Sequence, residues 1–214
     1  MVCSHCQGAD DVFSWGMAKR DLKAYHEKGA SKSTTILLNM LKKFGVTGKS
    51  LLDIGGGVGV IQHELINLGL EQAVDIDASG VYIQFARDEA ERQGHLEKIN
   101  FEQGDFVQLA PTVASADIVT LDRVVCCYPD MRALVDLSSA RAKEFYGLVY
   151  PRDNIISKAI IPIFNFFAFR IQGNPFRTFI HDTSEIEAII EVNGLEQIDH
   201  RKTGLWQVSL YQRR

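Results

Sequence analysis

The sequence predicts an α/β protein with a mostly parallel, seven-stranded sheet, helices on both faces and an antiparallel hairpin at the C-terminal edge. Apolar runs of strand length alternate with helical patterns between residues 50 and 149, which indicates right-handed βαβ units. Two further apolar runs, 195–200 and 206–212, are separated by a short turn and are expected to pair as a hairpin. A chain of 214 residues is long enough for one such domain.

Composition and charge exclude several classes of protein. Apolar residues make up 46% and charged residues 23% of the chain, as in ordinary globular domains. The net charge is −4 and no basic run stands out, so we expect no nucleic-acid partner. No secretory signal and no apolar run of roughly 18–20 residues is visible. We therefore expect a cytoplasmic protein without a transmembrane segment.

The first 45 residues are expected to form an N-terminal segment and a helical cap on the domain at 46–214. Residues 1–16 show no regular pattern, and a helical pattern runs from Met17 to Lys28. Ser33 or Thr34 is the expected N-cap of the next helix, which ends at Gly45.

The elements of the main domain follow from periodicity and turn residues. Strands are expected at 50–54, 72–76, 99–103, 116–121, 144–149, 195–200 and 206–212, with helices at 60–68, 81–93, 131–142 and 184–193. Residues 151–182 depart from the alternation, and we expect them to form an inserted aromatic lid.

The most informative motif is a glycine-rich turn directly after the first strand. Gly55, Gly57 and Gly59 alternate, and an acid, Asp53, stands two residues before the first glycine. A strand that leads through glycines into a helix exposes backbone N–H groups and a helix N-terminus to a ligand. The dinucleotide pattern G-x-G-x-x-G is not present. Asp53 would repel a pyrophosphate and suits a positively charged amino group.

The form D-x-G-x-G-x-G resembles motif I of the class I S-adenosylmethionine-dependent methyltransferases, which implies a Rossmann-like fold and S-adenosylmethionine as the cofactor. In that family an acid after the second strand accepts from both ribose hydroxyls, and Asp77, with Ala78 beside it, falls in this register. An acid after the third strand accepts from the adenine amino group, and Asp105 and Phe106 match that position. Asp122, after the fourth strand, lies beside the transferred methyl group.

Residues 121–130, LDRVVCCYPD, resemble the corresponding stretch of magnesium-protoporphyrin O-methyltransferases. Those enzymes methylate a propionate carboxylate on a flat porphyrin, and a carboxylate is ionised near pH 7 and requires no general base. Arg123 is a candidate to pair with an acceptor carboxylate, because a guanidinium can bind a carboxylate through two parallel hydrogen bonds. Asp122 and Tyr128 are the candidates to orient a protic acceptor or remove its proton. The structural alternatives are an ion pair for Arg123 and a packing role for the Tyr128 ring.

The expected function is methyl transfer from S-adenosylmethionine to a small, apolar acceptor, with O-methylation of a porphyrin-like carboxylate as the reaction implied by the resemblance. Three alternatives stay open. The first is a nucleotide- or NAD-binding protein, which the missing dinucleotide pattern disfavours. The second is a catalytically silent regulator that only binds the cofactor. The third is a metal- or thiol-dependent methyltransferase or sensor that uses the four cysteines, Cys3, Cys6, Cys126 and Cys127. The adjacent pair is poor geometry for a tetrahedral metal site, and we assign no metal ligand.

An aromatic, apolar stretch runs from Ile155 to Ile171 with Pro162 inside it. A helix that is apolar on most sides packs in a core or dimer interface, covers an apolar substrate, or contacts a membrane surface. Arg170 and Arg177 follow most of this stretch and are candidates to grip an anionic group, with solvent exposure as the alternative. The sequence leaves monomer and homodimer, and peripheral membrane contact, open.

Overall fold

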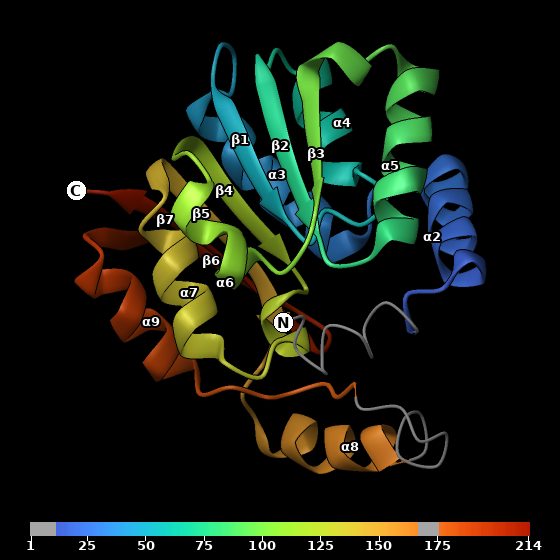
Figure 1. The fold of residues 1–214 in the computed structure, drawn as a ribbon. Helices are drawn as coiled ribbons and strands as arrows, with labels where there is room; N and C mark the ends of the chain where they lie inside the picture. The colour runs from blue at the N-terminus through green and yellow to red at the C-terminus, as the bar shows by residue number, and fades with distance from the viewer. Residues whose placement is uncertain (1–11, 167–175) are drawn as a thin grey trace.

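The computed structural model describes residues 12–166 and 176–214. Its seven-stranded sheet has the order β3-β2-β1-β4-β5-β7-β6 (Figure 1). The strands are β1 (Ser50–Ile54), β2 (Gln72–Asp77), β3 (Ile99–Gln103), β4 (Ala116–Asp122), β5 (Ala142–Pro151), β6 (Leu195–Thr203) and β7 (Trp206–Arg213). Only β7 runs antiparallel to its neighbours β5 and β6. The predicted fold class is confirmed.

Helices cover both faces of the sheet (Figure 1). The helices α3 (Lys32–Phe44), α4 (Val60–Asn67) and α5 (Gly80–Gln93) pack on one face, and α6 (Phe106–Leu109), α7 (Met131–Ser139) and α9 (Thr183–Val192) pack on the other. The remaining described α-helices are α2 (Trp15–Lys28), which packs on α5, and α8 (Ile155–Asn165). Each helical layer buries its own apolar core against the sheet.

Alternation of side chains along the strands separates the two cores. Leu51 points into the core beneath α3 and α4, whereas Leu52 points into the core beneath α7 and α9. Ile118 and Val119 on β4 divide in the same way. Because both faces of the central strands are covered, these strands read as continuous apolar runs rather than as alternating patterns.

Two predicted boundaries are wrong for identifiable reasons. The N-cap of α3 is Ser31, whose side chain accepts from the Thr34 N–H, rather than Ser33 or Thr34. The Thr34 hydroxyl is instead used in a long-range contact with Asp122. The helix predicted at 131–142 ends at Ser139, because Ala142 pairs with Ala116 and begins β5 two residues earlier than predicted.

The second of the two N-terminal helices, α3, packs directly on the sheet. Leu37 and Leu41 of α3 are buried in the same core as Leu51, Val149 and Val208. The boundary at residue 45 between a cap and the main domain therefore stays a prediction.

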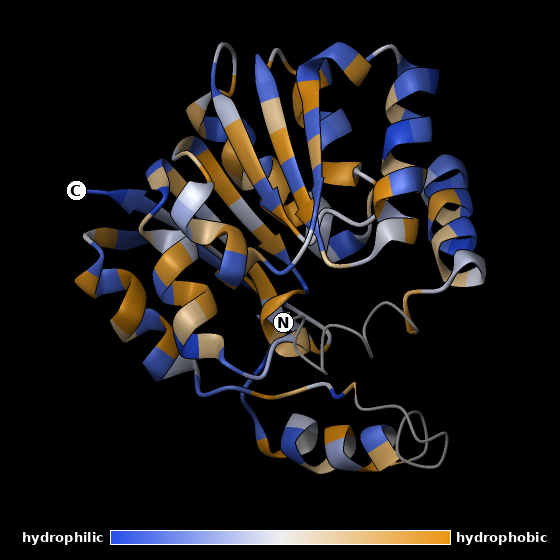
Figure 2. Cartoon of the chain, in the orientation of Figure 1, coloured by the Kyte–Doolittle hydropathy of each residue, from blue (hydrophilic) through white to orange (hydrophobic). Residues whose placement is uncertain are grey.

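The helix α8 lies apart from both helical layers (Figure 1), and apolar residues alternate with polar ones along it in Figure 2. Ile155 and Ile163 on α8 are 87% and 60% exposed, so core packing is the wrong expectation for them. Asn165 ties the end of α8 to residue 178, because its amide donates to and accepts from the Thr178 backbone. Phe167, Phe169 and Arg170 lie outside the described residues, and the lid at 151–182 stays a prediction. Within residues 12–166 and 176–214, no helix has the length and apolarity needed to span a bilayer.

Candidate functional site

The glycine turn that follows β1 contains three positions at which any residue other than glycine would be strained. Gly55, Gly57 and Gly59 have φ values of 67°, 61° and 81°, and Gly59 is the N-cap of α4. A Cβ placed on Gly55 would lie 2.4 Å from a methyl carbon of Val124, at the end of β4. The turn therefore presents bare backbone and the positive end of α4 at the carboxyl edge of the sheet.

Asp53 lies behind this turn rather than on its open side. Its side chain is buried, and its two oxygens accept from the Thr120 hydroxyl at 2.7 Å and from the Gln62 amide at 3.3 Å. Burial raises the pKa of Asp53 to about 7. The acid supports the turn from within the sheet, and its expected action on a charged amino group stays a prediction.

A second buried acid, Asp75 on β2, lies under the same turn and was not among the predicted site residues. A Cβ on Gly56 would lie 2.5 Å from an Asp75 oxygen and 2.4 Å from the Gln62 amide nitrogen. Burial raises the pKa of Asp75 well above its usual range, with the nearby Asp53 as a further cause. The signal in the sequence was a carboxylate in the middle of an otherwise apolar strand, Val74 to Ile76.

Asp77 ends β2 and holds the next loop together. One oxygen accepts from the Gly57 N–H at 3.1 Å, and the other accepts from the Ser79 N–H at 2.8 Å. Ala78 lies between these contacts in the same turn and is partly exposed. Asp77 thus joins the glycine turn of β1 to the start of α5.

Asp105 follows β3 and caps α6, because its carboxylate accepts from the Val107 N–H at 3.0 Å. The Tyr128 hydroxyl donates to the same carboxylate at 2.9 Å and 3.1 Å. The Phe106 side chain is buried in the core beneath α6 and α7. The structure therefore brings together Asp105, predicted on the cofactor side, and Tyr128, predicted on the acceptor side.

Asp122 ends β4, Arg123 follows it, and both side chains are engaged in contacts. The Thr34 hydroxyl donates to Asp122, the Arg123 guanidinium lies 3.4 Å from its other oxygen, and burial raises the pKa of the carboxyl. Arg123 has a φ of 65°, and it is the one non-glycine residue of 12–166 and 176–214 with positive φ. Its guanidinium stacks over the Trp206 ring at 5.3 Å and donates to the Ser33 hydroxyl at 3.2 Å. This geometry agrees with the alternative in which Arg123 forms an ion pair with a nearby acid, here Asp122.

Three residues that the sequence reasoning missed, Phe13, Phe176 and His181, lie near the same edge. The Phe13 ring lies edge-on to the rings of Tyr82 and Phe176, at 5.6 Å and 5.5 Å. The ring nitrogen Nε2 of His181 lies 3.1 Å from the Tyr128 carbonyl oxygen. No periodicity marks residues 12–14 or 176–181 as site segments, so only the folded chain reveals them.

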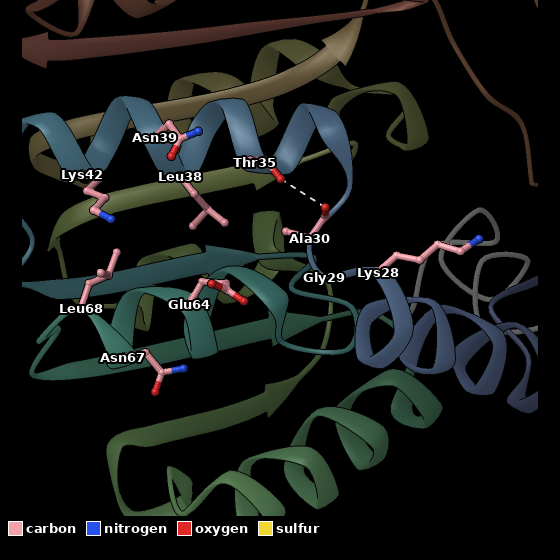
Figure 3. A pocket seen from close by; sticks show the side chains of 10 residues that line it. All are labelled: Lys28, Gly29, Ala30, Thr35, Leu38, Asn39, Lys42, Glu64, Asn67 and Leu68. Carbon is pink, nitrogen blue, oxygen red and sulfur yellow. Dashed lines mark hydrogen bonds between the residues drawn. The ribbon is translucent and has the colours of Figure 1, made fainter.

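A pocket of about 390 Å³ lies elsewhere, between the end of α2, α3 and α4 (Figure 3). It is lined by Lys28, Gly29, Ala30, Thr35, Leu38, Asn39, Lys42, Glu64, Asn67 and Leu68. None of the predicted site residues lines this pocket, and we assign it no function.

Comparisons with known proteins agree with this fold. Residues 46–150 match a family model described as a methyltransferase domain. The magnesium protoporphyrin IX methyltransferase from Synechocystis PCC 6803, solved with bound SAH, is 16% identical with a TM-score of 0.75, over 96% of this chain and 98% of that chain. An O-methyltransferase family protein from Burkholderia thailandensis is 16% identical with a TM-score of 0.68, over 84% and 55% of the two chains.

Curated sequence relatives match more locally. The ribosomal protein L11 methyltransferase of Photorhabdus laumondii is 32% identical over 91 residues, which are 42% of this chain and 30% of the relative. The corresponding protein of Vibrio parahaemolyticus is 23% identical over 176 residues, 82% of this chain and 52% of the relative. The chain thus spans a third to a half of the length of these relatives. The family match supports a methyltransferase domain at residues 46–150, as the glycine-rich motif predicts, and the likeness to the solved structures shows the shared fold.

Proposed function

We propose that the whole chain transfers a methyl group from S-adenosylmethionine to a small, apolar acceptor through a carboxylate, as on a porphyrin. The match of residues 46–150 to a methyltransferase domain model supports this proposal. One observation carries the proposal. The glycine turn, Asp77 and Asp105 follow three neighbouring parallel strands, β1, β2 and β3, at one edge of the sheet. In open α/β sheets, ligands bind at this edge.

The residues of this edge fit the parts of the cofactor. The Gly57 backbone has room beside it, since the nearest atom to a Cβ there would be a Tyr82 ring carbon at 3.6 Å. The Asp77 carboxylate holds two backbone N–H groups, and carboxylate oxygens accept more than one hydrogen bond each, as two ribose hydroxyls require. Asp105 and the Phe106 backbone are the proposed partners of the adenine ring, and Ala78 that of the adjoining ribose.

S-adenosylmethionine, when bound, supplies a methyl group activated by a sulfonium. The protein then has to align donor and acceptor and exclude water. The two candidate bases are already engaged: Asp122 with Thr34 and Arg123, and Tyr128 with Asp105. An acceptor that is ionised near pH 7, such as a carboxylate, needs neither of them as a base. This supports a carboxylate acceptor over a phenol or an amine.

The choice of a porphyrin-like acceptor rests on likeness along the chain. The solved magnesium protoporphyrin IX methyltransferase aligns over 96% of this chain, and residues 121–130 carry the resemblance noted in the sequence. The L11 methyltransferases that are about one-third identical match 91 residues. A match of that extent supports the shared domain and carries no argument about the acceptor.

Cofactor binding is tested by calorimetric titration of the purified chain with S-adenosylhomocysteine. Asp77→Ala is expected to weaken the affinity ten-fold or more, about 1.4 kcal/mol, because a paired set of hydrogen bonds is lost. Asp88→Ala, an exposed acid on α5, removes the same charge and is the matched control. Unchanged affinity in Asp77→Ala would show that Asp77 is not the ribose ligand.

Turnover is tested separately, with S-adenosylmethionine labelled on its methyl group. Magnesium protoporphyrin with free propionates is expected to take up the label, and the fully esterified porphyrin is the control, since it has no carboxylate to methylate. Transfer to a phenol alone would overturn the carboxylate proposal. Tight cofactor binding without transfer to any acceptor would favour the silent regulator.

A further inference from the structure

Two adjacent cysteines lie on the acceptor side of the site, in a single turn of 3₁₀ helix, η3 (Val125–Cys127), after β4. The Sγ atoms of Cys126 and Cys127 are 3.8 Å apart, and each lies 3.3 Å from the Arg123 carbonyl oxygen. Consecutive residues of a helix normally point in different directions. Here the left-handed turn at Arg123 aims one carbonyl at both thiols and brings the sulfurs together.

We propose that Cys126 and Cys127 form a binding site for a trivalent arsenical, whose arsenic atom bridges the two sulfurs. One atom can bridge two sulfurs only if they approach closely. For an atom with bonds of about 2.3 Å to sulfur, as zinc has, the sulfurs can be at most about 4.6 Å apart. The observed separation of 3.8 Å lies within this limit without rearrangement of the turn.

Burial selects the class of ligand. Cys126 is 2% exposed, and the neighbouring Cys127 thiol together with burial raises the pKa of Cys126 well above its usual range. A divalent cation requires cysteine ligands as thiolates, and the raised pKa of Cys126 disfavours that form. An organic arsenical with two hydroxyl groups condenses with two neutral thiols. Two S–H and two As–OH bonds break, two As–S bonds form, two waters leave, and arsenic stays trivalent. The product carries no net charge, so its formation leaves no ionised group at the buried Cys126.

The arsenical also needs no third protein ligand. An arsenic atom with one carbon substituent is complete with two sulfurs, whereas a structural zinc site uses four protein ligands. Among the residues that the structure describes, no cluster of three or more metal-ligating side chains is present. The pair of thiols matches the arsenical in number as well as in charge.

The site is coupled to the chain segment that covers it. The Phe179 N–H donates to the Cys126 carbonyl at 2.7 Å, and the Phe176 ring packs beside Cys127. Because Cys126 is buried, an arsenical can enter only when residues 176–179 move aside. Its occupation is then expected to displace this segment from the acceptor side.

The probe is phenylarsine oxide, and the test protein is the full chain with Cys3→Ser and Cys6→Ser. Since the chain has four cysteines, the only thiols left are those of Cys126 and Cys127. Intact mass spectrometry after removal of free reagent is expected to show one phenylarsenic adduct per chain, which dimercaptopropanol removes. Because the measured quantity is the mass of the chain, the result does not depend on whether the chain transfers methyl groups.

The matched control adds Cys127→Ser to the same background, which leaves a single thiol and is expected to lose the adduct. Peptide mapping of the adduct in the otherwise unchanged chain locates it without relying on the folding of any variant at 126 or 127. Absence of an adduct in the background protein, or retention of the adduct after Cys127→Ser, overturns the proposal.

Discussion

The two halves of the candidate site are built in different ways. On the cofactor half, at the ends of β1, β2 and β3, acids bind backbone N–H groups a short distance along the chain, as Asp77 binds Ser79 and Asp105 binds Val107. On the acceptor half, at the end of β4, side chains bind side chains from remote segments, as Asp122 binds Thr34. Contacts between residues that are close in sequence can be predicted from local motifs. Contacts between side chains of remote segments cannot be predicted in this way.

Besides the hydrogen bonds from Tyr128 to Asp105, a close packing contact joins the two halves. The Val124 side chain, after β4, lies where a side chain on Gly55 would have to be. The absence of a Cβ at Gly55 therefore serves the acceptor half as well as the glycine turn.

The largest expected effect tests this junction. Gly55→Ala places a residue at φ 67° and its Cβ at 2.4 Å from Val124. We expect a loss of about 1–2 kcal/mol from the left-handed backbone and a further loss of about 1–3 kcal/mol from overpacking. Urea unfolding gives the change in stability, and titration with S-adenosylhomocysteine gives the change in affinity.

Gly57→Ala is the matched control, because its φ is 61° and the nearest atom to its Cβ would be 3.6 Å away. It carries the backbone strain without the clash. Val124→Ala in the Gly55→Ala chain is expected to restore the part of the stability lost to the clash. Equal losses in the two glycine variants would mean that Val124 does not limit the turn.

The second effect concerns pH and is confined to the cofactor half. Burial raises the pKa of Asp53 to about 7, from 3.8 for the solvated carboxyl. Because the folded pKa is the higher one, the contribution of Asp53 to stability is fully present below about pH 4 and is lost as the pH rises towards 7. The loss amounts to about 1.4 kcal/mol per pH unit, up to about 4 kcal/mol in all.

Asp53→Asn keeps the shape of the side chain and removes its titration. In urea unfolding between pH 4 and 7.5, the variant is expected to gain stability relative to the unchanged chain as the pH rises. Because Asp53 is one cause of the raised pKa of Asp75, the difference between the two proteins reports the titration of Asp53 together with its effect on Asp75. Asp88→Asn, an exposed acid, is the control and is expected to run parallel to the unchanged chain, as a solvated carboxylate does. Parallel profiles for Asp53→Asn would show that Asp53 is ionised in the folded protein at neutral pH.

The same contrast explains how far the sequence could predict the molecule. The glycine turn and the acids at the ends of β2 and β3 were located residue by residue, because each follows a strand that the sequence predicts. The cap of α3 was placed two or three residues too late, because Ser31, Ser33 and Thr34 are all capping residues. The choice among them depends on the use of the Thr34 hydroxyl by Asp122, 88 residues away in sequence.

The acceptor half could be located but not interpreted. The segment 121–130 was expected at this edge, yet the partners of its residues come from segments without periodicity. Phe13, Phe176 and His181 reach the site through loops whose course depends on the packing of the whole domain. The sequence suggested roles for Asp122, Arg123 and Tyr128. The structure adds contacts that those roles did not include, with Thr34, Ser33 and Asp105 respectively.

The smallest expected effect decides between the two descriptions of Tyr128. Tyr128→Phe removes the hydrogen bonds to Asp105, which keeps the Val107 N–H and the Gln108 amide as partners. If Tyr128 orients Asp105, S-adenosylhomocysteine binds about 5-fold more weakly, which corresponds to about 1 kcal/mol, and kcat changes little. If Tyr128 removes a proton from the acceptor, kcat falls by about 10²–10⁴ and its pH dependence changes. Affinity by calorimetry and kcat across pH separate these outcomes. A small loss of affinity with an unchanged pH profile would place Tyr128 in the cofactor half, although its sequence neighbours belong to the other.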